Sequence, residues 1–342
     1  MHMQQLHNIT YLKAICALVV CFIHFKIFIM DLKNIDFDYL FYFVHFFFVI
    51  SGFVIFIKYY NNIITFSSVI HFLKKRFLRL YPLHVFFLVL FLLLEITKMI
   101  AQDHFNIKPN YDPFIKNNFE SFIYNIFLVH NIFGNPLSFN GPSWAVGSEF
   151  FTYLVFSLTI FILRKKIIIP IILFILFYSK YYSSSVFYSV HGFSTNLNCL
   201  FAFMVGGLFG LIFIKKKFFS LILIVFFLLT FIIYNKYYLA LLPFLFGYIL
   251  YQSSFKNQIF FKKNFFINSL FQFVGKISYS IYLAHSLILW IVIQIFNIVL
   301  KVNVYEFSLL STLFFLILLY FLTIIIAYLS YKYIENFFYQ KM

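Results

Sequence analysis

Long apolar runs separated by short polar segments make up most of this chain of 342 residues. Ten of the runs approach the ~20 residues that an α-helix needs to cross a hydrocarbon core about 30 Å thick. In chain order they cover approximately residues 11–29, 39–57, 81–100, 144–163, 166–179, 196–214, 218–234, 238–252, 278–300 and 307–331. The fifth and eighth runs are short, so we expect these helices to be tilted, kinked or partly re-entrant. The pattern predicts an all-α fold, namely a polytopic integral membrane helical bundle of about ten transmembrane helices.

The composition excludes a soluble domain of this length. Of all residues, 63% are hydrophobic and 25% aromatic, and only 11% are charged, which is more apolar surface than a soluble fold could bury. The first run carries a lysine and a histidine and lacks a small-residue cleavage site, so we expect a retained span and not a signal peptide. Cys16, Cys21 and Cys199 show neither metal-ligand spacing nor a disulfide framework. We therefore expect a single integral membrane domain over residues 1–342, without a metal site.

The distribution of charge predicts the topology. The net charge of +16 is not gathered into a patch of the kind that binds nucleic acid, because the basic residues lie in short clusters between apolar runs. If the N-terminus is cytoplasmic, 17 of the 26 lysines and arginines fall in inner segments and 8 in outer segments. Inner loops of membrane proteins are enriched in lysine and arginine. The asymmetry therefore predicts an even number of spans with both termini in the cytoplasm.

Two segments differ from the simple alternation of spans and short loops. Residues 67–80 are too charged to cross a membrane and read as an amphipathic cytoplasmic helix that runs into the third span. Arg76 and Arg79 lie on one side of this helix, either as a binding site or only as positive-inside charge that attracts lipid headgroups. The outer stretch 101–143 is long for a loop, so we expect it to cover the outer mouth of the bundle.

The first span carries two ionisable residues on one face. Lys13 and His24 are eleven positions apart, which returns to within about 20° of the same face roughly 16 Å further along the helix. Ionisable groups inside a span are costly, and this indicates a functional role. The alternative is a lysine that reaches the membrane edge and a histidine that is hydrogen-bonded within the bundle.

Glu149 lies five residues after Trp144, near the outer end of the fourth run. His24 falls in the outer half of its own span, so we expect the two side chains at a similar depth. A carboxylate beside an imidazole fixes its tautomer and raises its basicity, as a general base requires. The alternative is an acidic residue that the helix dipole stabilises at the membrane interface.

The ninth run begins with a polar stripe of Ser278, Tyr282 and His285, spaced by four and three residues. Such a stripe is expected to face the bundle interior. We place His285 in the inner half of its span. Hydrogen bonding within the bundle is the alternative to a substrate contact for these side chains.

Together these residues resemble membrane acyltransferase family three, the polytopic O-acyltransferases that modify bacterial surface polysaccharides and related acceptors. The resemblance covers nearly the whole chain. Lys13 to His24 is similar to the family's motif of a basic residue, ten spacers and a histidine. The further motifs are FFFVISGF (46–53), RFLRLYP (76–82), SWAVGSEFFTYL (143–154), ISYSIYLAH (277–285) and YIENFF (333–338). The motif SWAVGSEFFTYL keeps Trp144, Glu149 and Tyr153, but Ala145 stands where serine is usual. In the motif YIENFF, Phe337 stands where proline is usual.

The resemblance implies an acyl-CoA-dependent O-acetyltransferase of the bacterial inner membrane. The donor would be cytosolic acyl-CoA (acetyl-CoA), not a permanently bound cofactor, and the acceptor a hydroxyl of a cell-surface polysaccharide or its lipid-linked precursor. His24 would be the general base, oriented by Glu149. Lys13, Arg76 and Arg79 would bind the donor. The residues expected to contact substrate are Trp144, Tyr153, Ser278, Tyr282 and His285.

A transporter or flippase of a lipid-linked glycan is the alternative function. Ten spans with charge inside the membrane fit a transporter as well. The R-x-x-R cluster and the absence of repeated halves in the sequence favour the acyltransferase. The expected partners are then acyl-CoA, a saccharide acceptor and membrane lipids, with no nucleic acid. Direct transfer and an acyl-enzyme intermediate both remain open.

Overall fold

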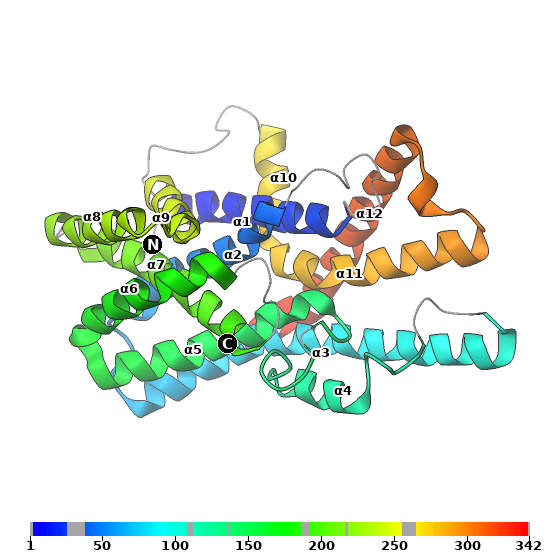
Figure 1. The fold of residues 1–342 in the computed structure, drawn as a ribbon, viewed down its shortest axis with the longest axis horizontal. Coiled ribbons are helices and arrows are strands. Elements are labelled where there is room, and N and C mark those ends of the chain that lie inside the picture. Colours follow the sequence, from blue (N-terminus) through cyan, green and yellow to red (C-terminus); the bar gives the residue numbers. More distant parts are fainter. Residues whose placement is uncertain are drawn as a thin grey trace.

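The computed structural model describes residues 3–25, 38–107, 112–135, 137–185, 192–215, 218–254 and 265–340. These ranges form helices joined by turns and short loops (Figure 1), so the predicted all-α membrane bundle is confirmed. The helices are α1 (Met3–Phe25), α2 (Tyr42–Tyr59), α3 (Phe66–Phe105), α4 (Phe119–Ile126), α5 (Trp144–Leu163), α6 (Ile168–Ser185), α7 (Phe193–Lys215), α8 (Phe218–Tyr234), α9 (Leu241–Ser253), α10 (Phe265–Lys276), α11 (Ser278–Gln294), α12 (Leu309–Ser330) and α13 (Asn336–Gln340).

The helices match the ten apolar runs of the sequence. Within the described ranges, seven helices are long and apolar enough to cross a membrane, and three shorter apolar helices lie in α6, α8 and α9. The two runs predicted to be short correspond to α6 and α9. Residues 26–29 of the first run, and several of the loop charges on which the topology rests, lie outside the described residues.

The charged segment 67–80 and the third span form one continuous helix, as predicted. This helix, α3, has 40 residues, and the Thr65 side chain caps its first turn by accepting from the Ser68 amide. At 1.5 Å per residue it is about 60 Å long, roughly twice the thickness of a hydrocarbon core. Figure 1 shows α3 running along most of the length of the bundle. It therefore carries Arg76 and Arg79 at one level and Glu95 several turns away.

Close packing of α2 against α7 fixes the centre of the bundle. A Cβ added at Gly52 would overlap the backbone carbonyl of Phe203, and one added at Gly206 would overlap that of Val49. Small residues let membrane helices approach until their backbones touch. The position of α2, which carries Ser51, is therefore set by backbone contact with α7.

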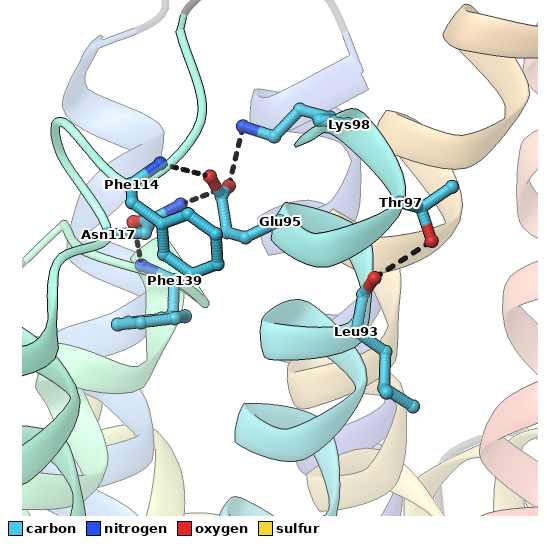
Figure 2. A network of polar contacts seen from close by, with 7 residues as sticks. All are labelled: Leu93, Glu95, Thr97, Lys98, Phe114, Asn117 and Phe139. Atoms are coloured by element: carbon cyan, nitrogen blue, oxygen red, sulfur yellow. Dashed lines mark hydrogen bonds and ion pairs between the residues drawn. The ribbon is translucent and has the colours of Figure 1, made fainter. Parts of the chain in front are cut away.

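The segment from residue 112 to 143 packs against the end of α3 that carries Glu95. Figure 2 shows that the Glu95 carboxylate is ion-paired to Lys98 at 2.6 Å and accepts from Asn117 Nδ2 at 2.7 Å and from the Phe114 amide at 3.0 Å. Asn117 in turn accepts from the Phe139 amide at 2.5 Å. One buried carboxylate thus connects both ends of this segment to α3.

Candidate active site

Seven of the ten predicted site residues line one cavity. It has a volume of about 150 Å³ and lies between α1, α2, α3, α5 and α11. The predicted residues in its lining are Lys13, Arg76, Arg79, Glu149, Tyr153, Ser278 and Tyr282. These residues are far apart in the sequence and meet only through the helix packing. Trp144, His24 and His285 are not part of this lining.

Arg76 is a cation held among aromatic rings. Its guanidinium donates to the Tyr59 hydroxyl at 3.1 Å and lies 5.4 to 6.0 Å from the ring centres of Tyr59, Phe72 and Tyr153. Its Nε is buried without a hydrogen-bond partner, and no carboxylate in the described ranges pairs with it. A guanidinium on aromatic faces keeps its outward N–H groups available for an anion.

Arg79, three residues later, is neutralised by a carboxylate. It forms an ion pair with Glu335 at 2.5 Å, and Ser280 donates to the other Glu335 oxygen at 2.7 Å. The Tyr279 ring lies 5.9 Å from the Arg79 guanidinium. Glu335 was missed in the sequence analysis as a site residue, although it is the acidic residue of the YIENFF motif.

Lys13 completes the basic side of the cavity. Its side chain lines the cavity from α1 and makes no hydrogen bond or ion pair with the described part of the chain. Three cations therefore face this region, with Glu149 and Glu335 as the two carboxylates near them. Because Lys13 and Arg76 have no carboxylate partner in the described ranges, the excess of positive charge makes the cavity suitable for an anionic ligand.

Glu149 does not contact His24, so the predicted pairing of these two side chains is wrong. Its carboxylate accepts from Ser51 Oγ at 2.9 Å and from the Tyr153 hydroxyl, and these two hydroxyl groups are themselves 2.9 Å apart. A similar depth in the membrane is not sufficient for contact, because α5 turns Glu149 toward α2 and the cavity. Ser51 was missed in the sequence analysis, although it is the hydroxyl residue of the FFFVISGF motif.

His24 lies instead against the second predicted histidine. The ring centres of His24 and His285 are 4.9 Å apart, and Phe41 packs on His24 at 6.1 Å. We placed His24 in the outer half and His285 in the inner half of their spans, and the contact corrects the separation that this placement implied. His285 is the eighth of the 17 residues of α11, and the last turn of α1 meets the middle of that helix. Position along a span indicates depth only when the two spans begin at the same level. Gly275, near the end of α10 and three residues before α11, packs against Thr10 of α1, so α11 begins beside the first half of α1 and not beside its first turn.

The turn before α5 is hydrogen-bonded to α11 on both sides of His285. Asn140 Nδ2 donates to the Leu283 carbonyl at 3.0 Å, and Ser286 Oγ donates to Asn140 Oδ1 at 2.6 Å. The Tyr282 hydroxyl donates to the Pro142 carbonyl at 2.8 Å. Of the predicted polar stripe on α11, Ser278 and Tyr282 line the cavity, Tyr282 also bonds to this turn, and His285 lies against His24.

Trp144 begins α5 and packs edge-on against Phe48, with the ring centres 6.1 Å apart. Phe48 itself lines the cavity, so Trp144 lies behind the wall and not in it. Within the described ranges, no group of three histidine, cysteine, aspartate or glutamate side chains is placed to hold a metal ion. The cavity and the pair of His24 and His285 together hold all of the predicted site residues except Trp144.

Comparison with known proteins identifies the class to which this arrangement belongs. A family profile described as an acyltransferase domain matches residues 6–332, which is nearly the whole chain. No curated protein and no solved structure gives a match. The matched range contains all of the predicted site residues, from Lys13 to His285. The chain belongs to acyltransferase family three and is a multi-pass membrane acyltransferase.

Proposed function

We propose that this protein is an acyl-CoA-dependent O-acetyltransferase. It transfers an acetyl group from cytosolic acetyl-CoA to a hydroxyl of a cell-surface polysaccharide or of its lipid-linked precursor. The observation that supports this most is the cavity that Lys13 and Arg76 line without carboxylate partners in the described ranges. Such a site favours a ligand that brings its own negative charge, and the phosphates of CoA supply it.

The size of the cavity limits which part of the donor enters it. A volume of about 150 Å³ accommodates a small acyl group and its thioester, but not the whole of CoA. The nucleotide end of the donor then remains outside the cavity, and its phosphates are drawn toward Arg76, which has no carboxylate partner in the described ranges. A short acyl group such as acetyl fits this space.

The transfer itself requires a base, because a sugar hydroxyl is a weak nucleophile at neutral pH. In the proposed reaction, His24 takes the proton of the acceptor hydroxyl as its oxygen attacks the thioester carbonyl carbon. The carbon–sulfur bond breaks, and the CoA thiolate recovers the proton from His24 as CoA leaves. Tyr282 connects the two sites, since it lines the cavity and its ring centre lies 6.0 Å from that of His285.

The orientation in the membrane follows from the charge asymmetry of the sequence. We place the protein in the bacterial inner membrane, with both termini in the cytoplasm and the segment 112–143 on the outer side. Arg76 and Arg79 then face the cytosolic donor, and the His24 end of α1 faces the acceptor. The donor and acceptor thus approach one bundle from opposite sides.

The experiment is an acetyl-transfer assay in liposomes with purified protein and labelled acetyl-CoA. We expect acetyl transfer to a lipid-linked or free polysaccharide in the wild type, and weaker use of the donor when Lys13 and Arg76 are both changed to alanine. Lys332→Ala is the control, because it removes an exposed cation that does not line the cavity. Movement of a lipid-linked glycan across the liposome without turnover of acetyl-CoA would contradict the proposal and support a transporter.

A further inference from the structure

His285 has a buried nitrogen atom for which the described structure offers no partner. The side chain is 0% exposed, and its Nε2 makes no hydrogen bond. The other ring nitrogen, Nδ1, lies 3.3 Å from the backbone carbonyl of Ile281. Buried polar atoms in proteins almost always have a partner, so an unpaired Nε2 indicates a hydrogen bond that forms during function.

The contact with Ile281 fixes the tautomer of His285. A carbonyl oxygen only accepts hydrogen bonds, so Nδ1 carries the proton, and in the neutral ring Nε2 then has a free lone pair. The ring of His24, 4.9 Å away between ring centres, is the nearest ionisable side chain in contact with it. Imidazole bases are commonly oriented by a third group that accepts from their second nitrogen.

We infer that His285 is the positioning residue of His24: its Nε2 accepts a hydrogen bond from one nitrogen of His24 and directs the other nitrogen at the acceptor hydroxyl. This inference rests on the proposed function. The reacting proton passes from the acceptor hydroxyl to His24 and then to the CoA thiolate. His285 keeps its own proton on Nδ1 throughout. Hydrogen bonds of this kind are often long in a structure without substrate and shorten when substrate binds.

No other side chain near the pair, among the residues that the structure describes, provides this support. Glu149 is occupied by Ser51 and Tyr153. The Tyr282 hydroxyl donates to the Pro142 carbonyl.

On α12, which also neighbours the pair, the Tyr320 hydroxyl donates to the Leu18 carbonyl. Phe25 and Phe41, which pack on the two histidines, are apolar. Of these side chains, His285 is the one with an acceptor nitrogen that has no other hydrogen-bond partner in the described structure.

The surrounding hydrogen bonds hold His285 in place for this role. Asn140 is bonded to Leu283 and Ser286, two residues before and one residue after the histidine. Because these bonds join α11 to the turn before α5, the ring has little freedom to move along the helix. A positioning residue requires this kind of restraint.

The test compares two substitutions of His285 in the acetyl-transfer assay. His285→Ala removes the acceptor, and His285→Gln keeps an oxygen that accepts. We expect His285→Ala to lower kcat about 10²-fold per folded molecule and to leave the KM for acetyl-CoA unchanged. The kcat of His285→Gln should be at least about tenfold higher than that of His285→Ala. His45→Gln is the matched control, because His45 is also a buried intramembrane histidine but is bonded to Tyr182.

Two results would overturn the inference: a kcat in His285→Ala within about threefold of wild type, or a His285→Gln variant no more active than His285→Ala. If His285→Ala does not fold, His285→Phe replaces it, since phenylalanine fills the space without accepting a hydrogen bond. Wild-type protein that transfers no acetyl group would refute the proposed function itself. The wild-type and His24→Ala activities, measured first, separate that failure from failure of the role of His285.

Discussion

Arg79 and Glu335 form an ion pair at 2.5 Å, whereas Arg76, on the same helix, has no carboxylate partner in the described ranges. The two arginines of the R-x-x-R motif therefore have different environments. Arg79 joins α3 to the π-helical turn Tyr331–Glu335 near the end of the chain. Within the described ranges, the contacts of the Arg76 guanidinium are with aromatic rings and the Tyr59 hydroxyl.

We expect single substitutions to separate these roles. Arg76→Ala should weaken acetyl-CoA binding about 10- to 100-fold, because a hydrogen bond to a charged group contributes ~1.5–3 kcal/mol. Arg79→Ala should instead lower the free energy of unfolding by about 3 kcal/mol, since it leaves the buried Glu335 carboxylate without its counter-ion. Calorimetric titration with acetyl-CoA and thermal unfolding in detergent measure the two effects.

Glu335→Gln in the Arg79→Ala background is the control for this assignment. It removes the unpaired charge and should restore part of the lost stability. Equal donor affinity in wild type and Arg76→Ala would contradict the role of Arg76 in donor binding and leave it as a topology determinant.

A second prediction concerns the partners of Glu149. Ser51→Ala and Glu149→Gln should be coupled in their effects on stability by about 0.5–3 kcal/mol, because the two side chains share a hydrogen bond. Glu149→Gln and His24→Gln should be additive within about 0.5 kcal/mol, because these side chains do not touch. Double-mutant cycles of thermal unfolding measure both values. Strong coupling between Glu149 and His24, with no coupling between Glu149 and Ser51, would contradict this prediction and support the pairing of Glu149 with His24.

The fold could be predicted from the sequence because a lipid environment leaves few alternatives. Every backbone polar group must be satisfied inside the membrane, so each long apolar run becomes a helix. Hydropathy therefore located all ten runs, including the shorter α6 and α9. The continuity of 67–80 with the third span was also predicted. The helix that begins at Phe66 continues past Arg79 and through Pro82 into the span.

The partners of the site residues could not be predicted in the same way. Spacing along a helix gives a face, but the direction of that face depends on how the helices pack. Glu149 and His24 were paired by depth alone, and the structure gives each a different neighbour. Ser51 and Glu335 both lie in recognised motifs, but a sequence does not show that one meets Glu149 and the other Arg79.

A third prediction concerns pH and the segment outside the membrane-spanning helices. The pKa of His130 is lowered to about 3, from an unfolded value of about 6.5. Burial is the larger cause, and electrostatic repulsion by the nearby His84 is the second. Below pH 6.5 the unfolded chain takes up a proton that folded His130 refuses, so stability is lost as the pH falls from about 6.5 toward 3. The slope from this residue is at most ~1.4 kcal/mol per pH unit.

Thermal unfolding of wild type and His130→Gln between about pH 7 and pH 5 checks this prediction. The variant should show a weaker fall in unfolding temperature. His71→Gln, which removes an exposed histidine, should keep the wild-type dependence. Identical slopes in wild type and His130→Gln would exclude His130 as a source of acid sensitivity.

The fourth prediction tests the orientation in the membrane. In a variant without the three buried cysteines, Lys116→Cys should react from outside the cell with a maleimide that does not cross membranes. Lys116 is suitable because it is exposed, whereas the adjacent Asn117 is bonded to Glu95 and Phe139. Lys74→Cys, exposed near the other end of α3, should react only after permeabilisation. The reverse labelling pattern would invert the proposed topology.

The most direct test of the proposed mechanism is the activity of His24→Ala per folded molecule. If His24 is the general base, the variant should insert and fold normally, bind acetyl-CoA with wild-type affinity, and transfer acetyl groups about 10²- to 10⁴-fold more slowly. The measurement is single-turnover acetyl transfer, normalised to folded protein determined by size-exclusion chromatography. Substantial activity per folded molecule in His24→Ala, or a loss that only follows the loss of folded protein, would contradict the assignment of His24 as the base.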